Sequence, residues 1–210
     1  MKFVVLTIFL LVSFGCLAKA QTNYDAEALK SFREIRDRSF RNAAETPLLN
    51  EDLLKFKGLE YFGTDAKFAV CAKLEKRSDA QVFMMPTSIG TTRKYFKYGV
   101  LKFELGGKSF SLTAFQSEAE AKNTENKGAL FVPFRDLTNG TATYGAGRYL
   151  NIKKPSDNET VLDFNFAYNP NCAYGNDNFS CAIPPKENFL QTEIKAGEKK
   201  FVSVSANEEK

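Results

Sequence analysis

Carboxylate, amide, guanidinium and phenol side chains gather in one stretch of the chain, residues 129–199. Groups of these types bind small polar molecules through bidentate or directed hydrogen bonds. We therefore predict that this stretch forms a pocket for a small polar ligand. The residues expected to bind it are Arg148, Tyr149, Asp163, Asn165, Tyr168, Asn169, Glu187 and Asn188.

Two of these carboxylates also permit a catalytic interpretation, in which Asp163 and Glu187 divide the acid and base roles. The chain contains no His. It therefore lacks the usual general base near neutral pH and the commonest zinc ligand. The first alternative is a histidine-independent hydrolase or lyase, and the second is a purely structural stretch with no ligand. The sequence identifies no cofactor and predicts no metal site.

A buried carboxylate needs a partner, and for Asp163 the expected partner is Arg148. Asp163 and Asn165 lie two residues apart in Val161 to Ala167, which we expect to be a strand with both polar groups on one face. The nearby Gly145-Ala146-Gly147 lacks the third glycine and the following helix of a dinucleotide site, so that interpretation is rejected.

Cys172 and Cys181 flank a loop rich in Gly and Asn. In an oxidising compartment the two would form a disulfide. The alternative is a pair of small buried thiols. No other Cys or His stands at ligand spacing, which argues against zinc.

The composition indicates one β-rich domain, expected over residues 21–204. The chain has 210 residues, 43% of them apolar, and contains 20 Phe and 8 Tyr but no Trp. The formal charge is +4, and residues 1–20 contribute Lys2 and Lys19 and no acid, which leaves +2. This charge is too small to indicate nucleic-acid binding.

The N-terminus has the pattern of a signal peptide, residues 1–20. Lys2 precedes an apolar run that ends at Gly15, and Ala18-Lys19-Ala20 offers a cleavage site before Gln21. We therefore expect an exported protein, periplasmic or secreted, with no transmembrane segment in the mature chain. The alternative is a lipoprotein anchored through Cys16. Residues 205–210 are expected to form a disordered tail.

Tyr24 to Arg41 has the pattern of a helix capped by Thr22 or Asn23. Its arginines form either a solvated face or, in the alternative, include one that reaches into the site. From Lys57 onward, short alternating runs separated by turn residues predict mainly antiparallel β structure. The expected fold is mainly β (α+β): an antiparallel β-barrel or sandwich of short strands with the N-terminal helix packed against it.

The clearest hairpin joins residues 101–105 to 108–112 through Gly106-Gly107. A two-residue loop places Phe103 opposite Phe110. Asn139-Gly140 predicts a second hairpin with a two-residue loop, in which Phe134 faces Gly145, Val132 faces Gly147 and Pro133 disturbs the pairing. Further strands are expected at 68–74, 81–85, 190–195 and 201–205.

These motifs resemble the family known as domain of unknown function 1684, uncharacterised proteins of bacteria and archaea. Ala182 and Phe189 depart from the family pattern. The resemblance implies membership and carries no activity. The matching residues are Pro133-Phe134, Asp136, Thr138 to Gly140, Thr143-Tyr144, Gly147 to Leu150, Asp163 to Asn165, Ala167 to Pro170, Cys172 to Tyr174, Cys181, Pro184-Pro185, Glu187-Asn188 and Ala196 to Lys199.

Overall fold

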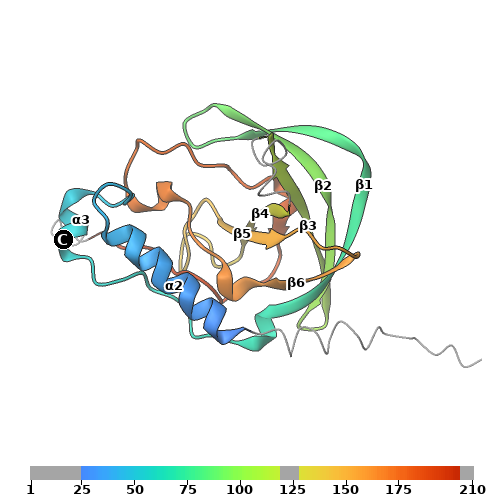
Figure 1. Ribbon diagram of the computed structural model, residues 1–210, viewed down its shortest axis with the longest axis horizontal. Helices are drawn as coiled ribbons and strands as arrows, with labels where there is room; N and C mark the ends of the chain where they lie inside the picture. The colour runs from blue at the N-terminus through green and yellow to red at the C-terminus, as the bar shows by residue number, and fades with distance from the viewer. Residues whose placement is uncertain (1–24, 119–127, 204–210) are drawn as a thin grey trace, which may run out of the picture.

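The computed structural model describes residues 25–118 and 128–203 (Figure 1). The expected signal peptide, Cys16, the capping residues Thr22 and Asn23, and the expected tail at 205–210 lie outside the described residues.

In the described part of the chain, seven strands form one curled sheet, an open half-barrel, with the order β5-β4-β3-β2-β1-β6 and β7 paired to β4 (Figure 1). All neighbours are antiparallel except β4 and β7. The predicted class, mainly antiparallel β with an N-terminal helix, is confirmed. The strands are β1 (Ala69–Pro86), β2 (Thr92–Leu105), β3 (Lys108–Ser117), β4 (Ala129–Asp136), β5 (Arg148–Lys153), β6 (Glu159–Asp163) and β7 (Phe189–Leu190).

The β2–β3 hairpin has the predicted register. Phe103 pairs with Phe110 and Leu105 with Lys108 across the Gly106-Gly107 turn, where both glycines have positive φ. The turn chemistry and the alternation of apolar residues agree here, so the local sequence is sufficient to define the pairing.

β1 is longer than expected, because the predicted strands 68–74 and 81–85 join into one strand of 18 residues. The pairing with β2 shifts between Lys76 and Gln81, which marks an irregularity in the middle of the strand. Irregularities of this kind bend a strand and increase its twist. The long curved strands β1 and β2 therefore form the wall of the half-barrel (Figure 1).

β4 and β5 are antiparallel as expected, but the predicted two-residue loop is wrong. Phe134 faces Arg148 and Val132 faces Leu150, because the connection runs from residue 137 to residue 147. Side chains within this connection bond to one another, as Asn139 Nδ2 does to Thr143 Oγ1 at 2.9 Å. The longer loop is thereby stabilised by its own polar groups, an arrangement that Asn-Gly spacing does not reveal.

The predicted disturbance of the β4–β5 pairing by Pro133 is wrong, because Pro133 pairs regularly with Tyr149; the sheet is interrupted on the other side of β4, toward β3. Strands β3 and β4 pair only at Phe115 and Phe131. Past that point the amide of Asn188 bonds to both sides: it accepts from Thr113 N at 2.7 Å and donates to Thr113 O at 2.9 Å and Pro133 O at 2.7 Å. Asn188 thus replaces the missing strand contacts, and β7 follows it along β4.

Helix α2 (Ala26–Arg41) runs beside the half-barrel, and α3 (Asn50–Lys55) follows it (Figure 1). The N-cap of α2 is Asp25, whose carboxylate accepts from Ala28 N at 2.8 Å. On its buried face, the ring of Phe32 contacts Phe166 with the centroids 5.3 Å apart. This contact docks the helix against the segment that follows β6.

Among the described residues, one 3-10 helix precedes β1 and three more interrupt the second half of the predicted pattern. The expected strand 161–167 ends at Asp163, because η2 begins there, and the expected strands 190–195 and 201–205 reduce to β7 alone among the described residues. The compact turns place Phe164 in the core beside Phe103 and Phe134. The 3-10 helices are η1 (Ala66–Phe68), η2 (Phe164–Phe166), η3 (Asn171–Tyr174) and η4 (Lys186–Asn188).

Candidate functional site

A cavity of about 460 Å³ opens between the sheet and the loop that carries the two cysteines. Its size lies within the usual range for small-molecule sites, roughly 300–1,000 Å³. All of its lining residues except Arg93 and Tyr95 come from residues 129–199. They are Arg93, Tyr95, Phe131, Tyr149, Tyr168, Pro170, Asn171, Asn178, Phe179, Ser180, Cys181 and Ala182.

A row of aromatic rings forms one wall of this cavity. The ring centroids of Tyr95 on β2 and Phe131 on β4 lie 5.6 Å apart and are stacked. Phe131 meets Tyr149 on β5 edge to face at 4.8 Å, and Tyr149 meets Tyr168 in the same way at 5.8 Å. Adjacent rings therefore brace one another, so the wall is stiff before any ligand arrives.

The phenols of this wall are held by protein partners. Tyr149 is buried and its hydroxyl donates to the Ala182 carbonyl at 2.5 Å. Burial raises the pKa of Tyr149 well above its usual value, so the group stays neutral. The Tyr168 hydroxyl accepts from Asn151 Nδ2 at 2.8 Å, and its backbone exchanges two hydrogen bonds with that of Tyr149. Two of the eight predicted ligand-binding residues are therefore fixed in this cavity.

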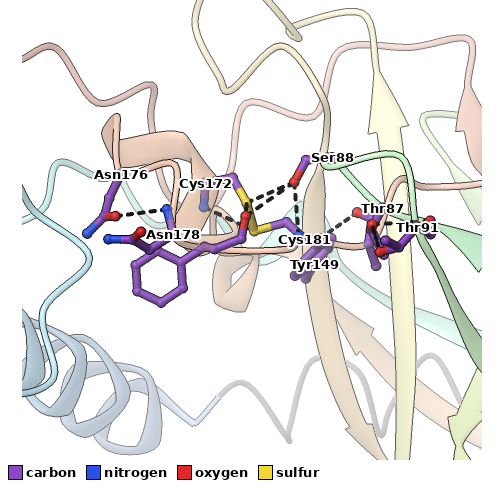
Figure 2. The surroundings of a disulfide bond; sticks show 10 residues. Thr87, Ser88, Thr91, Tyr149, Cys172, Asn176, Asn178 and Cys181 are labelled. Atoms are coloured by element: carbon purple, nitrogen blue, oxygen red, sulfur yellow. Dashed lines mark hydrogen bonds between the residues drawn. A yellow bond between two sulfur atoms is a disulfide. The ribbon is translucent and has the colours of Figure 1, made fainter.

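Cys172 and Cys181 form a disulfide at the rim of the cavity (Figure 2). Ser88 bonds to the same segment through both its backbone and its side chain: its backbone N donates to the Cys181 carbonyl at 2.9 Å, and its hydroxyl accepts from Cys181 N at 3.1 Å. The loop with Asn178 and Ser180 is thus closed at its base by a covalent bond and tied to the turn after β1.

Arg93 on β2 is the one charged residue that lines this cavity in the described structure. Its side chain is exposed, and it makes no ion pair with the described part of the chain. Its charge lies near enough to Tyr149 to oppose the rise in the pKa of that phenol. Among the described residues, the cavity therefore combines an apolar aromatic wall, amide groups at its rim and one positive charge that has no acidic partner.

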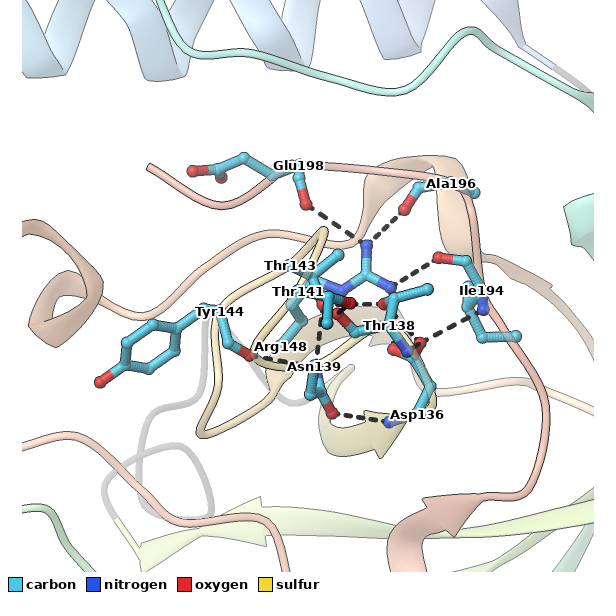
Figure 3. Close-up of polar contacts among 10 residues, drawn as sticks. All are labelled: Asp136, Thr138, Asn139, Thr141, Thr143, Tyr144, Arg148, Ile194, Ala196 and Glu198. Carbon is cyan, nitrogen blue, oxygen red and sulfur yellow. Dashed lines mark hydrogen bonds and ion pairs between the residues drawn. The ribbon is translucent and has the colours of Figure 1, made fainter. Parts of the chain in front are cut away.

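Arg148 lies in a separate, fully buried cluster (Figure 3). Its Nη2 donates to Asp136 Oδ2 at 2.9 Å and to the Ile194 carbonyl at 2.8 Å, and its Nη1 donates to the carbonyls of Ala196 and Glu198. Burial lowers the pKa of the guanidinium, and the charge of Asp136 opposes that effect. The predicted pairing of Arg148 with Asp163 is wrong: its partner is Asp136, which β4 places opposite β5.

Asn169 belongs to a second buried cluster centred on Glu198. Its side chain donates to Glu198 Oε1 at 3.0 Å and to the Lys199 carbonyl at 2.7 Å. The same carboxylate accepts from the Tyr174 hydroxyl and from Arg36 Nη2, the latter at 2.9 Å. Burial raises the pKa of Glu198, and the charge of Arg36 opposes the rise. Glu198 therefore binds α2 to the C-terminal segment.

One arginine of α2 does reach inward, as the sequence alternative proposed, but it enters the Glu198 cluster rather than the cavity. The guanidinium carbon of Arg36 lies 4.8 Å from the ring centroid of Tyr168, on the ring that also lines the cavity. Arg33 stacks on Tyr61 at 4.4 Å and lines a second cavity of about 430 Å³ beside α2. This second cavity includes none of the eight predicted residues.

Asp163 and Asn165 lie near η1, where they hold a loop. Asp163 Oδ1 accepts from Asn165 N at 2.9 Å and from Asn165 Nδ2 at 2.7 Å. Asn165 in turn bonds to both backbone groups of Asp65, accepting at 3.1 Å and donating at 3.0 Å. Burial raises the pKa of Asp163, while Asn165 and the charge of Arg33 oppose the rise. All of these contacts are structural.

Glu187 lies at another part of the surface, paired with Lys97 at 2.9 Å. Burial alone would raise the pKa of Glu187. The hydrogen bond and the charge of Lys97 lower this pKa by more, so the net shift is downward. Along β1, Asp163 faces Ala69 whereas Lys97 faces Gln81. Each carboxylate also has its own partner, Asn165 for Asp163 and Lys97 for Glu187. The two carboxylates therefore do not form a pair.

Arg93, Tyr95 and Phe131 are the strand residues of the cavity that sequence reasoning missed, and the lining residues from 170–171 and 178–182 were not predicted to bind a ligand either. The three strand residues carry no motif of their own, because a strand residue lines a cavity only through its neighbours in the sheet. Asp136, Tyr174 and Glu198 were also missed as partners, although all three lie within the motifs quoted for the family resemblance. That likeness was the one signal that could have singled them out.

The described residues contain no group of three or more His, Cys, Asp or Glu side chains that could hold a metal ion. Among the described helices, none is long and apolar enough to cross a membrane.

Comparisons with known proteins agree with the resemblance found in the sequence. The family model described as "Protein of unknown function (DUF1684)" matches residues 54–199. The solution NMR structure of an uncharacterized protein from Haloarcula marismortui is similar, with a TM-score of 0.66 and 37% sequence identity. The alignment covers 82% of this chain and 92% of that one. None of the curated proteins matches the chain.

Proposed function

The chain belongs to the DUF1684 family of proteins of unknown function, and we propose that it is an exported binding protein for a small molecule. The proposed site is the cavity between the aromatic wall and the disulfide-bonded loop. The observation that carries the proposal is the combination of a volume of about 460 Å³ with a row of braced rings and a polar rim. Sites with these properties bind small molecules.

The proposal narrows the site expected from the sequence. Of the eight residues, Tyr149 and Tyr168 line the cavity. Arg148, Asn169 and Asn188 are fully buried and satisfy protein groups, so we assign them to the structure that holds the cavity walls. Asp163 is bonded to Asn165 and Glu187 is paired with Lys97, and neither carboxylate lines the cavity. The hydrolase alternative therefore has no geometric support.

Export is supported by the N-terminal pattern of residues 1–20 and by the disulfide between Cys172 and Cys181. Disulfides persist in oxidising compartments such as the periplasm or the extracellular space. Mass spectrometry of the exported protein tests this part: a chain that starts at Gln21 supports cleavage after Ala20. Acyl mass on Cys16 would favour the lipoprotein alternative.

Ligand binding is tested by blocking the cavity. A library of small aromatic and polar compounds should raise the melting temperature of the parent protein, and Ser180→Trp should abolish those shifts because the indole fills the cavity. The matched control is Ser111→Trp, on the exposed face of β3. The proposal fails if no compound shifts the parent, or if the two tryptophan variants respond alike.

A further inference from the structure

The charge in the cavity indicates what kind of molecule fits there, on the premise that the proposed function is correct. Arg93 lines the cavity without an acidic neighbour among the other lining residues. The hydroxyls of Tyr149 and Tyr168 already have protein partners, and burial keeps Tyr149 neutral. The local charge is therefore positive.

Aromatic walls by themselves can bind cations, but a positive charge at this place disfavours them. Arg93 repels a cation, whereas a guanidinium forms two parallel hydrogen bonds with a carboxylate or phosphate. The rest of the wall is ring surface from Tyr95, Phe131 and Tyr168. Such surfaces bind a flat apolar group by stacking or by edge contacts.

The rim of the cavity adds neutral polar groups at its outer side. Asn171 and Asn178 are exposed, and Ser180 is half-buried next to Cys181. These side chains can donate to and accept from ring substituents but add no charge. They suit a ligand that carries hydroxyl or carbonyl groups, and they are a poor match for a long alkyl chain.

We propose that the cavity binds a small planar acid: an aromatic or comparable flat ring against the tyrosine and phenylalanine wall, with one anionic group on Arg93. The anionic group is a carboxylate or a phosphate, since a guanidinium recognises both. The volume of about 460 Å³ accommodates one such molecule.

The test uses matched probes that differ in charge: benzoate, phenyl phosphate, benzyl alcohol and benzylamine, each titrated into the full mature protein by NMR. Benzoate or phenyl phosphate should bind most tightly, and their relative affinities distinguish carboxylate from phosphate. Arg93→Gln should weaken the preferred acid by about tenfold or more, the loss expected for a charge-assisted hydrogen bond. Binding of benzyl alcohol should stay the same.

Arg38→Gln is the matched control, because Arg38 is an exposed arginine of α2 outside the cavity lining. It should leave all four affinities unchanged. If benzylamine or benzyl alcohol binds as well as the acids in the parent, the proposed charge selectivity is wrong, although the cavity still binds ligands. If the acids bind equally to Arg93→Gln, Arg93 is not the anion site. If none of the probes binds, while other compounds give shifts that Ser180→Trp removes, only the planar-acid inference is overturned.

Discussion

Arg148 and Asp136 form an ion pair with 2.9 Å between Nη2 and Oδ2, and both side chains are completely inaccessible to solvent. The pair joins β5 to β4. The other Nη hydrogens of Arg148 bind carbonyls of Ile194, Ala196 and Glu198, and Asp136 Oδ1 accepts from Thr138 and Ile194. The buried charge of Arg148 is therefore neutralised by Asp136 and hydrogen-bonded to the backbone. The pair has a structural role.

Replacing Arg148 with Met should destabilise the protein by about 3–5 kcal/mol, because Asp136 is left as an unpaired buried charge. Adding Asp136→Asn should recover part of this loss, since the amide oxygen still accepts from Thr138 and Ile194 while the stranded charge disappears. Urea unfolding of both single variants and the double variant measures the coupling. Additive losses would show that the two residues act independently.

Asn188→Ala should cost about 2–4 kcal/mol, because it leaves a backbone N–H and two carbonyls of β3 and β4 without partners. The matched control is Asn178→Ala on the exposed loop, which should change the free energy of unfolding by less than about 0.5 kcal/mol. Amide hydrogen exchange at Thr113 provides a direct measurement, because that N–H loses its acceptor. Unchanged protection of Thr113 would contradict this role for Asn188.

Gly147→Ala should destabilise the protein by about 2 kcal/mol or more, since positive φ and steric overlap act together. Gly147 has φ +108°, and a Cβ there would lie 2.6 Å from the Phe134 carbonyl oxygen. Gly140→Ala is the control: its φ is +87° but no heavy atom lies within 4 Å of the added carbon, so only the conformational cost of about 1 kcal/mol remains. Equal losses in thermal unfolding would refute the close approach at Gly147.

Asp163 and Glu187 should have opposite effects on the pH dependence of stability. Burial raises the pKa of Asp163 in the folded state. The contribution of Asp163 to the free energy of unfolding is therefore present below its unfolded pKa and is lost as pH rises through its folded pKa. Asp163→Asn should therefore become more stable relative to the parent as the pH rises from about 3 to about 7. The amide oxygen of the variant can still accept from Asn165.

Glu187 has a lowered pKa in the folded state, because Lys97 outweighs the effect of its burial. Its contribution to the free energy of unfolding is therefore present above its unfolded pKa and is lost as pH falls through its folded pKa. Glu187→Gln should therefore become less stable relative to the parent over the same rise in pH. The effect should be small, because 43% of the Glu187 side chain is exposed. Denaturation curves across this pH range test both, and parallel trends for the two variants would contradict the assignment.

The fold class and one hairpin were predictable because their determinants are local. The Gly106-Gly107 turn and the alternation around it define the pairing of Phe103 with Phe110. The Asn139-Gly140 turn misled the prediction, because its polar neighbours bond within a longer loop instead of continuing the strands. Local turn chemistry competes there with side-chain bonds that the spacing does not encode.

By itself, the sequence determined the mainly antiparallel β class, the N-terminal helix and the stretch from which most of the cavity is built. Alternation, turn residues and family motifs are properties of neighbouring residues, so they can be read along the chain. Only the tertiary structure decided which polar groups are already satisfied and which face the cavity. Asn188 meets Thr113 across 75 positions, and Arg93 joins the cavity from outside the stretch. Such partners are selected by the packing of the whole sheet, because burying a polar group is favourable only where a matching group from a distant segment is already held.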